Sequence, residues 1–480
     1  MLERVTAVTA VMWFRRDLRL NDNQALAKAC TYEGPLILLF HVQPEQFIAE
    51  SYNHQAFFSS VRQFQKRVNK EHHLQVLYGD LKEAFLRLKQ EVPDWDQIYF
   101  NQDDTGVGAL RDQHVLPLLE ELGIRVERYN DHYLHGAYEI KNKSGEAYKV
   151  YTPYYHQWLQ LPKPTPAKVE WSACTSAVGE SLFPEDEQRL AEVYTALPEG
   201  QLYPHGEEAA LEQLNGFLET EVSAYHNKRD LPYSDSTSHL STYLRTGELS
   251  IRTIWEKLQA QPDTQGKQTF IKELCWREFY NMIYAQHPHQ KEEALQQQFR
   301  CVEWENDQQV FAKWQLGQTG YPLVDAAMRQ LREHGWMHNR LRMIVASFLT
   351  KDLLIDWRWG EKYFQKMLID YDPASNIGGW QWAASTGTDA VPYFRIFNPV
   401  TQSKRFDPEG DFIRKYVPEL RKVPAALIHE PAKMTKEQQA ACGVHVGEDY
   451  PLPVVDHQEA RKRTLFRYEA SKERAAEARL

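Results

Sequence analysis

The first 133 residues alternate between short apolar runs and amphipathic helical patterns, and this alternation limits the folds open to the chain. A strand that is apolar throughout is buried on both faces, as in a parallel sheet covered by helices. The alternation therefore predicts a doubly wound parallel α/β domain. The apolar runs are Val8–Phe14, Pro35–Val42, Leu74–Tyr78, Gln97–Asn101 and Arg125–Tyr129, and the helical patterns cover about 22–31, 54–71, 80–92 and 107–122.

The remainder of the chain has a different pattern. No G-x-G-x-x-G segment follows the first apolar run, so the usual dinucleotide fingerprint is missing. A stretch rich in Pro and Tyr, followed by an acidic one, predicts a connector, and the spacing after it is helical. The sequence predicts an α/β domain at 1–133, a connector at 134–205 and an all-α domain at 206–480, with the charged tail as an exposed helix.

Charge, cysteine content and hydropathy narrow the setting. The net charge of −10 argues against nucleic acid, but residues 180–221 alone hold eleven acidic side chains and one basic one. Segments 329–366 and 395–424 are locally basic, which fits either a DNA-facing surface or ordinary solvated helix faces. Five cysteines without a C-x-x-C pair predict no disulfide framework and a cytoplasmic protein. No apolar run reaches the ~18 residues of a membrane span.

Tryptophan is concentrated in one part of the chain. Eight of the thirteen lie between Trp276 and Trp382. Large aromatic side chains are usually core residues. So dense a cluster also suits stacking against planar ligands, or a series of redox-active rings.

Two segments combine polar groups at helical spacing. In YHNKRDLPYSDSTSHLS, residues 225–241, hydroxyls gather at a predicted helix start, where they either help bind phosphate or simply cap the helix. In KELCWREFY, Glu273, Trp276 and Arg277 share a helix face, which suits a stacked polar heterocycle or a surface ion pair. His334 and His338 lack a third ligand, so no metal is expected.

A third group lies further along the chain. Asp370 and Asp372 precede a predicted turn at Gly378–Gly379, and they fit metal binding, acid–base chemistry or a buried ion pair with Arg342. Glycines beside indoles indicate close approach of the backbone to a flat ring. One predicted helical turn carries a carboxamide, two guanidiniums and a thioether: Asn339, Arg340, Arg342 and Met343.

Together these segments resemble the photolyase/cryptochrome family, and most strongly the class I cyclobutane pyrimidine dimer DNA photolyases of bacteria. The resemblance covers nearly the whole chain and is most specific over residues 225–424. It implies an antenna-binding α/β domain, a helical FAD-binding domain and light-dependent DNA repair. The matching segments are WFRRDLRLNDNQAL, TSHLS, KELCWREFY, TGYPLVDAAMRQL, GWMHNRLRM and NIGGWQWAASTGTDAVPYFRIFNP.

The resemblance implies a U-shaped, buried FAD that is reduced and anionic in the active enzyme. Arg342 and Asp370 resemble a salt-bridged pair beside the isoalloxazine, Asp372 lies at its polar edge, and Asn376 matches the residue that faces flavin N5. Phe270 stands where Trp is usual in the relatives. The implied cofactor contacts are Tyr225, Thr237, Ser238, His239, Leu240, Ser241, Phe270, Arg277, Trp336, Asn339, Arg342, Asp370, Asp372 and Asn376.

The resemblance also implies the reaction. Excited reduced FAD donates an electron to a flipped-out pyrimidine dimer in double- or single-stranded DNA, and the dimer splits. The protein acts as a monomer, and Glu273, Asn339 and Asn376 are the implied catalytic residues. The implied lesion contacts are Arg229, Glu273, Trp276, Asn339, Arg340, Met343 and Trp382. Trp380, Trp357 and Trp304 match the family's electron-hopping triad, which photoreduces an oxidised cofactor but does not perform repair.

The sequence departs from the family at the antenna site. Relatives that bind methenyltetrahydrofolate place Asn-Glu just before an R-x-R-D segment, where this chain has Val107 and Gly108 ahead of ALRD. Folate loses its expected polar anchors. A deazaflavin, a flavin, a folate held differently or no antenna at all fits this departure.

Three other functions stay open at this point. A cryptochrome would signal without repair, although Asn376, the lesion contacts and the short remainder after residue 424 favour repair. A (6-4) photolyase would place a second His where Arg342 stands. A module that stacks single strands on its Trp cluster would need neither a flavin nor the Asp370–Arg342 pair.

Overall fold

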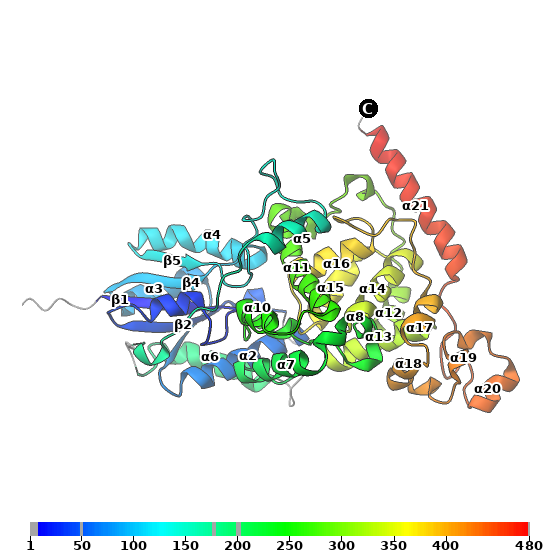
Figure 1. Cartoon of the computed structure of the whole chain (residues 1–480), viewed down its shortest axis with the longest axis horizontal. Coiled ribbons are helices and arrows are strands. Elements are labelled where there is room, and N and C mark those ends of the chain that lie inside the picture. Colours follow the sequence, from blue (N-terminus) through cyan, green and yellow to red (C-terminus); the bar gives the residue numbers. More distant parts are fainter. Residues whose placement is uncertain (1–7, 49–50, 175–178, 198–202, 479–480) are drawn as a thin grey trace, which may run out of the picture. The chain divides into compact units, whose positions relative to one another are not determined.

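The structure is a computed structural model, and it describes residues 8–48, 51–174, 179–197 and 203–478 (Figure 1). Contacts divide the chain into two compact units. Unit 1 comprises the described parts of 1–148, 153–223 and 238–286, and unit 2 those of 149–152, 224–237 and 287–480. Unit 1 thus contains helices from beyond the sheet-forming region. The domain limits inferred from the sequence stay a prediction.

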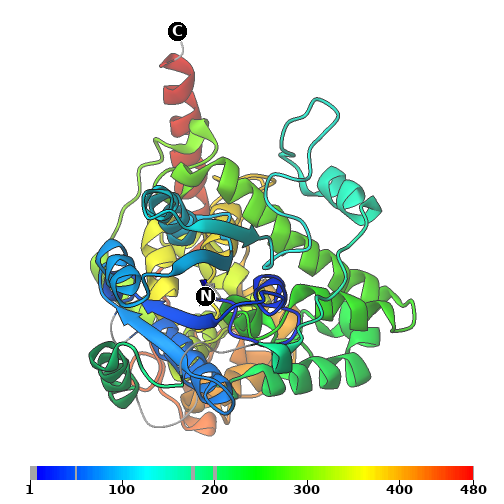
Figure 2. The same ribbon diagram turned by 90° about the vertical axis from the view of Figure 1, so that its left-hand side faces the viewer.

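Unit 1 is built on a five-stranded sheet in the order β3-β2-β1-β4-β5 (Figure 2). Every neighbouring pair of strands is parallel. The strand order reverses direction between β1 and β4, as in doubly wound folds. The predicted α/β fold class is confirmed, with strands β1 (Thr9–Phe14), β2 (Leu36–Val42), β3 (Leu74–Tyr78), β4 (Trp95–Asn101) and β5 (Arg125–Tyr129).

The strands supply a separate core on each face of the sheet, because successive side chains point in opposite directions. Ala10 and Met12 belong to one core, with α1, α2 and α6. Val11 and Trp13 belong to the other, with α3 and α4. The covering helices are α1 (Gln24–Ala29), α2 (Tyr52–Val68), α3 (Leu81–Glu91), α4 (Gly106–Glu121) and α6 (Pro184–Ala196).

The predicted connector contributes to the sheet layer. Helix α6 lies along the edge strand β3, where the Asp186 carboxylate accepts from Tyr78 N at 2.9 Å. The Gln75 side chain donates to Glu180 O at 2.8 Å and accepts from Leu182 N at 2.7 Å. These contacts cover an edge that would otherwise present unpaired backbone groups.

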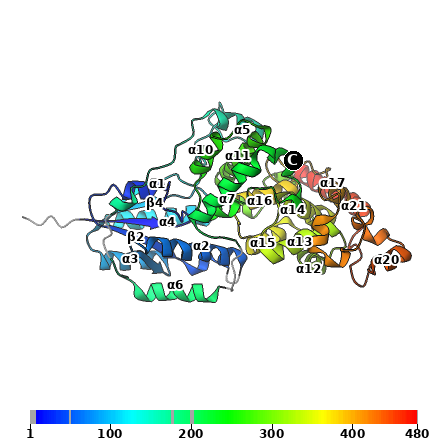
Figure 3. The same ribbon diagram turned by 60° about the horizontal axis from the view of Figure 1, so that its bottom comes forward.

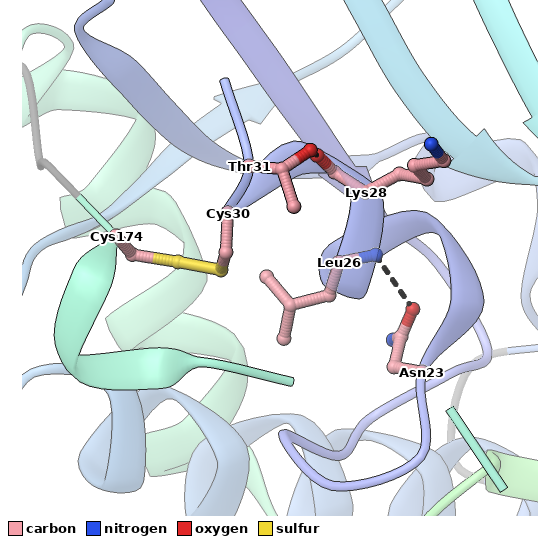
Figure 4. Close-up of a disulfide and its surroundings, with 6 residues drawn as sticks. All are labelled: Asn23, Leu26, Lys28, Cys30, Thr31 and Cys174. Atoms are coloured by element: carbon pink, nitrogen blue, oxygen red, sulfur yellow. Dashed lines mark hydrogen bonds between the residues drawn. A yellow bond between two sulfur atoms is a disulfide. The ribbon is translucent and has the colours of Figure 1, made fainter. Parts of the chain in front are cut away.

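One prediction about the cysteines is wrong. Cys30, at the end of α1, forms a disulfide with Cys174, at the end of the short helix η2 (Trp171–Ala173) (Figure 4). The two lie 144 residues apart in sequence, so no local spacing signals the pair. Both belong to the core on the α1 face of the sheet, which is what brings them together. Because disulfides are uncommon in reducing compartments, the cytoplasmic setting stays a prediction.

Further helices belong to unit 1, and the described part of unit 2 is helical, as predicted for this part of the chain. In unit 2, helices α13 to α16 pack side by side (Figure 3). The further α-helices of unit 1 are α5 (Tyr151–Gln160), whose first two residues belong to unit 2, α7 (Glu207–Thr220), α9 (Ser241–Thr246), α10 (Ile251–Gln259) and α11 (Gln265–Gln286). The main unit 2 helices are α8 (Tyr225–Lys228), α12 (Gln308–Leu316), α13 (Pro322–His334), α14 (Asn339–Ser347), α15 (Trp357–Met367), α16 (Pro373–Ala383), α17 (Pro399–Phe406), α18 (Asp411–Tyr416) and α21 (His457–Glu477).

The C-terminal tail is helical as predicted, but it is not exposed all round. Helix α21 buries a stripe formed by Ala460, Thr464, Tyr468 and Ser471. The stripe packs on the short helices η6 (Gln297–Phe299) and η7 (Phe348–Asp352) of the same unit. Because the tail is rich in charged residues, its composition alone did not indicate this buried stripe.

Glu248 makes the stability of unit 1 depend on pH. Its carboxylate accepts from Gly206 N and Thr246 Oγ1, and full burial raises its pKa to about 7. The folded state favours the neutral acid. The contribution of Glu248 to the free energy of unfolding is therefore fully present below pH 4.5 and is lost as the pH rises through about 7. We expect Glu248→Gln to exceed the wild type in stability by up to about 3 kcal/mol at pH 8 and to match it near pH 4.5.

Urea unfolding of both proteins at several pH values measures this difference. A difference between the two that does not change from pH 4.5 to pH 8 would contradict the assignment.

Candidate functional site

Helix α11 carries the first group of predicted residues. Glu273, Trp276 and Arg277 lie on one helix, as the spacing predicted. Glu278, which follows Arg277 directly, holds the helix in place. Its carboxyl group is fully buried, and burial raises its pKa. Glu278 accepts from Leu134 N at 2.6 Å and from Trp158 Nε1 at 2.6 Å. The sequence analysis missed Glu278 because its partners lie more than a hundred residues away.

Two predicted cofactor residues of unit 1 have contacts within that unit. Arg277 donates to His132 O at 2.7 Å and lies over the Tyr133 ring at 4.3 Å. Phe270 is buried and packs on Phe217 of α7, with the ring centroids 4.8 Å apart. Their roles toward the cofactor stay predictions.

The hydroxyl-rich segment leads into helix α9, which begins at Ser241. The residue before it is Leu240, and no side chain caps the helix. Ser238 Oγ accepts from Leu240 N at 3.4 Å, whereas Thr237 Oγ1 is buried without a hydrogen-bond partner among the described residues. Simple helix capping therefore does not account for these hydroxyls. His239, at φ 52°, bends the chain between them.

Two further residues, Tyr225 and Arg229, come from the start of the same segment. Tyr225 is buried at the first position of α8, and the Arg229 guanidinium lies over its ring at 5.6 Å. Arg229 is also 3.9 Å from Asp230, which accepts from Arg340 Nη2 at 2.9 Å. The structure thus groups two of the predicted DNA-contacting arginines around one carboxylate.

Helix α14 positions the next group. His338 precedes the helix, and its Nδ1 accepts from Arg340 N at 3.1 Å, so this histidine is a helix cap. Arg342 donates from Nη2 to Asp370 Oδ2 at 2.8 Å and from Nε to Met337 O at 2.7 Å. The ion pair predicted between Arg342 and Asp370 is therefore present. Asn339 is exposed, and Met343 and Trp336 are half-buried.

Helix α16 carries Asn376, Trp380 and Trp382. Asp372 caps the helix by accepting from Ser375 N at 2.9 Å. The predicted turn at Gly378–Gly379 is wrong, because both glycines lie inside α16. Two glycines were interpreted as a chain reversal, but helices tolerate them at a cost in stability.

A second carboxylate missed by the sequence analysis orients Asn376. The Asn376 Nδ2 donates to Glu361 Oε1 at 3.1 Å, and Tyr371 OH donates to the same oxygen at 2.9 Å. Burial raises the pKa of Glu361. This hydrogen bond engages the amide nitrogen of Asn376, so its carbonyl oxygen points away from Glu361.

The three predicted electron carriers all belong to unit 2. Trp380 and Trp357 are 2% exposed, and Trp304 is half-buried. A Cβ at Gly360 of α15 would collide with the Trp380 ring, so α15 and α16 meet closely. The chain beside Trp304 is bonded to the start of α15, where Trp357 lies: Glu305 N donates to Leu354 O at 2.8 Å, and Asp356 N to Asn306 Oδ1 at 2.9 Å.

The predicted residues thus form two groups. Unit 2 brings together the residues of α8, α14 and α16 with Thr237, Asp370 and Asp372, and unit 1 holds Ser238 to Ser241 and the α11 residues. Among the predicted cofactor and electron-transfer residues, the buried donors Thr237 Oγ1 and Trp380 Nε1 lack a protein partner among the described residues. A free hydroxyl, a free indole N–H and the Arg342–Asp370 pair within one unit suit FAD, which offers phosphate and heterocyclic acceptors.

Unit 1 contains a second cluster, where the chain departs from the folate-binding pattern. Asp103 follows β4 and is paired with Arg16 and, at 2.8 Å, with Arg111. A side chain at Gly108 would collide with the Asp103 carboxylate. Asp103 therefore leaves no room for the glutamate of the folate-binding relatives. Arg15 follows β1 and is paired with Asp112, while its Nε and Nη2 lack partners among the described residues.

Comparison with known proteins identifies the family. The model for the FAD-binding domain of DNA photolyase matches residues 270–470, and the DNA photolyase model matches residues 10–170. The "Deoxyribodipyrimidine photo-lyase" of Alkalihalophilus pseudofirmus is 45% identical, over 95% of this chain and 96% of its own.

Two solved structures are also similar. The crystal structure of a bacterial class III photolyase from Agrobacterium tumefaciens is 34% identical, with a TM-score of 0.93, over 98% of this chain and 99% of its own. An archaeal photolyase from Sulfolobus tokodaii "with two FAD molecules" is 31% identical, with a TM-score of 0.82, over 96% and 100%.

The chain belongs to the DNA photolyase family. The predictions of an FAD-binding helical domain and of a deoxyribodipyrimidine photo-lyase are confirmed. Among the described residues, no helix is long and apolar enough to cross a membrane, and no group of three or more potential metal ligands occurs.

The contact between α15 and Trp380 gives a test of the packing at this site. We expect Gly360→Ala to lower the free energy of unfolding by about 1–3 kcal/mol, because the added methyl group overpacks the indole. Gly216 of α7 is the matched control, since it is exposed on a helix and a Cβ there meets nothing. Gly216→Ala should raise stability by about 0.5–1 kcal/mol. Thermal unfolding measures both, and equal shifts in the two variants would contradict the packing argument.

Proposed function

We propose that the protein splits cyclobutane pyrimidine dimers in DNA, using light and reduced FAD. The Arg342–Asp370 ion pair carries this proposal, because its guanidinium can offset the negative charge of a reduced heterocycle. FAD, when bound and reduced, supplies an electron to the dimer on absorbing light and takes it back after the ring opens. Asn376 and the set of lesion contacts favour repair over a signalling cryptochrome, and Arg342, which is paired with Asp370 where a (6-4) photolyase would place a second His, argues against that alternative.

The protein's own residues bind and orient the two reactants. Arg342 balances negative charge, and Asn376, held by Glu361, presents an amide of fixed orientation. Glu273, in its protonated form, donates a hydrogen bond to a carbonyl of the dimer and stabilises the negative charge that develops there. Trp276 and Trp382 provide stacking surfaces for the flipped bases.

DNA binding is assigned to the two locally basic segments of unit 2, residues 340–366 and 395–424, and the affinity that their cations supply falls with salt. The exposed cations of the second segment include Lys404, Arg405, Arg421 and Lys422. The remaining finer assignments are proposals of the same kind: a class I enzyme, a monomer, a cytoplasmic setting and both double- and single-stranded substrates.

We assign the second chromophore to the crevice between β1 and β4, where the strand order reverses and ligands bind in open α/β sheets. Arg15, with two buried donors without partners, is the group that would contact it. Asp103 against Gly108 disfavours methenyltetrahydrofolate in its usual pose. A flavin or a deazaflavin therefore suits the crevice better than a folate.

The first experiment is repair of an oligonucleotide with one thymine dimer by pre-reduced protein, under blue light and in the dark. We expect thymine to be restored only in the light. Glu273→Ala should lower the rate about tenfold or more, since it removes a hydrogen bond to a charged group, while Glu273→Gln should retain part of the activity. A flavin-loaded protein without light-dependent repair would contradict the proposal.

Absorption spectra of gently purified protein test the antenna. We expect either a deazaflavin band besides that of FAD or, where the antenna is itself a flavin, more than one flavin per chain, and Arg15→Ala should remove this second chromophore while one FAD per chain remains. Release of a folate on denaturation, or a single flavin per chain with no second chromophore, would contradict this assignment.

A further inference from the structure

A fully buried carboxamide lies on α16 between two tryptophans with proposed roles. It is Gln381, and both hydrogens of its Nε2 are used, because the nitrogen donates to Gln290 O at 2.7 Å and to Glu293 O at 3.1 Å. The Gln381 Oε1 accepts from Leu295 N at 2.9 Å. Three hydrogen bonds therefore join one side chain of α16 to the backbone of residues 290–295, all within unit 2.

The segment that Gln381 contacts has little regular structure of its own, since it runs from the short helix η5 (Pro288–Lys291) to η6. Its backbone groups therefore depend on side chains for partners. Gln296, which follows, donates from N to Thr386 O at 2.8 Å and from Nε2 to Gly387 O at 2.7 Å. A Cβ at Gly387 would collide with the Gln381 side chain, so this junction has no free space at that point.

The direction of the Gln381 side chain also sets the directions of its neighbours, because successive residues of an α-helix are rotated by about 100°. Trp380, one residue earlier, is buried and packs on Phe364 of α15, with the ring centroids 5.0 Å apart. Trp382, one residue later, is half-buried and leaves the helix on a different side. A rotation of α16 about its axis would therefore move both indoles and break the hydrogen bonds of Gln381.

A buried amide fixes the rotation of a helix more strictly than an apolar side chain does. Apolar contacts are not directional, so an apolar residue at this position would tolerate small rotations. Hydrogen bonds weaken steeply as their angles change, and a buried polar group left without a partner incurs its full desolvation cost. The three backbone groups bonded to Gln381 therefore hold α16 in one rotational state.

We propose that Gln381 is a positioning residue for repair, which locks the rotation of α16 so that Trp382 presents its ring to the dimer. This inference rests on the proposed role of Trp382 as a stacking surface for the flipped bases. Gln381 is itself fully buried, so it acts through Trp382 and not by touching DNA. Loss of the lock affects recognition of the dimer, whereas binding to undamaged DNA depends on the exposed cations.

Binding and repair assays on pre-reduced, FAD-loaded protein test this proposal. Discrimination is defined as the ratio of the dissociation constants for an undamaged oligonucleotide and for one with a thymine dimer. Gln381→Met keeps the length of the side chain and removes all three hydrogen bonds. We expect discrimination to fall, and KM for repair to rise, about tenfold or more, while kcat and the affinity for undamaged DNA stay within about twofold. Unchanged discrimination, or a loss confined to kcat, would overturn the proposal.

A double-mutant cycle shows whether Gln381 acts through Trp382. Trp382→Ala removes the stacking surface and should by itself lower discrimination about tenfold or more. In that background Gln381→Met should change discrimination less than about twofold, because the ring that it positions is gone. A loss of the same size in both backgrounds would show that the two residues act independently, and the proposal would then be wrong.

Gln439 of α20 (Lys436–Cys442) supplies the matched control. Its Nε2 donates to Met434 O at 3.0 Å and its Oε1 accepts from Val446 N at 2.9 Å, in the same unit and outside both basic segments. Gln439→Met should leave discrimination unchanged. A loss equal to that in Gln381→Met would assign the effect to a general loss of packing and would contradict the proposal.

Gln381→Glu is the second variant, and it decides the question if Gln381→Met does not fold. The carboxyl group keeps the acceptor for Leu295 N but loses at least one of the two donated hydrogen bonds. Discrimination should therefore fall by about threefold or more. Full discrimination in folded Gln381→Glu would overturn the proposal.

The proposed function is tested separately by the wild type and by Trp382→Ala. A wild-type protein that does not discriminate dimers from undamaged DNA would contradict the proposed function. Discrimination that survives Trp382→Ala would contradict the role of Trp382 and, with it, this inference. Loss of discrimination in Trp382→Ala but not in Gln381→Met would overturn this inference alone.

Discussion

A fully buried ion cluster holds unit 1 together. Arg252 of α10 is 0% exposed, and its guanidinium donates to Asp131 at 2.6 Å and to Asp22 at 2.8 Å. Arg19, which follows β1, donates to the same Asp131 at 2.5 Å. The two arginines lower the pKa of Asp131 against the effect of burial. Removing one partner of such a network leaves an unpaired buried charge, at a cost of about 3–5 kcal/mol.

This cluster explains why unit 1 contains more than the α/β sheet. It joins α10 to loops at the carboxyl ends of the strands, and α11 follows α10 directly. Glu278 then bonds α11 to backbone N–H groups after β5. The position of Glu273 and Trp276 is therefore set by polar contacts with the sheet-forming region, although the sequence pattern assigns them to the helical domain.

The sequence was sufficient to predict features that depend on residues close together in the chain. All five strands were predicted within two residues at either end; the inner strands are continuous apolar runs because they are buried on both faces, whereas the edge strand β5 is largely exposed. The motifs of α11, α14 and α16 identified the Arg342–Asp370 pair because the family pattern includes both residues. Local patterns say nothing about partners distant in the chain, so the contact of Glu361 with Asn376 and the Cys30–Cys174 disulfide were missed.

Fold alone does not decide the activity in this family, which includes both repair enzymes and light sensors. The proposed photoreduction residues Trp380, Trp357 and Trp304 all lie in unit 2, whereas the proposed lesion contacts come from both units. The placement of the electron carriers therefore depends on the packing within unit 2, although the implied flavin contacts come from both units. Repair also requires Glu273 and Trp276, and hence the buried carboxylates that fix α11. A change at Glu273 alone, which is not among the implied flavin contacts, would remove repair while leaving the light-driven oxidation of the tryptophans intact, which is the difference expected between a repair enzyme and a light sensor built on the same fold.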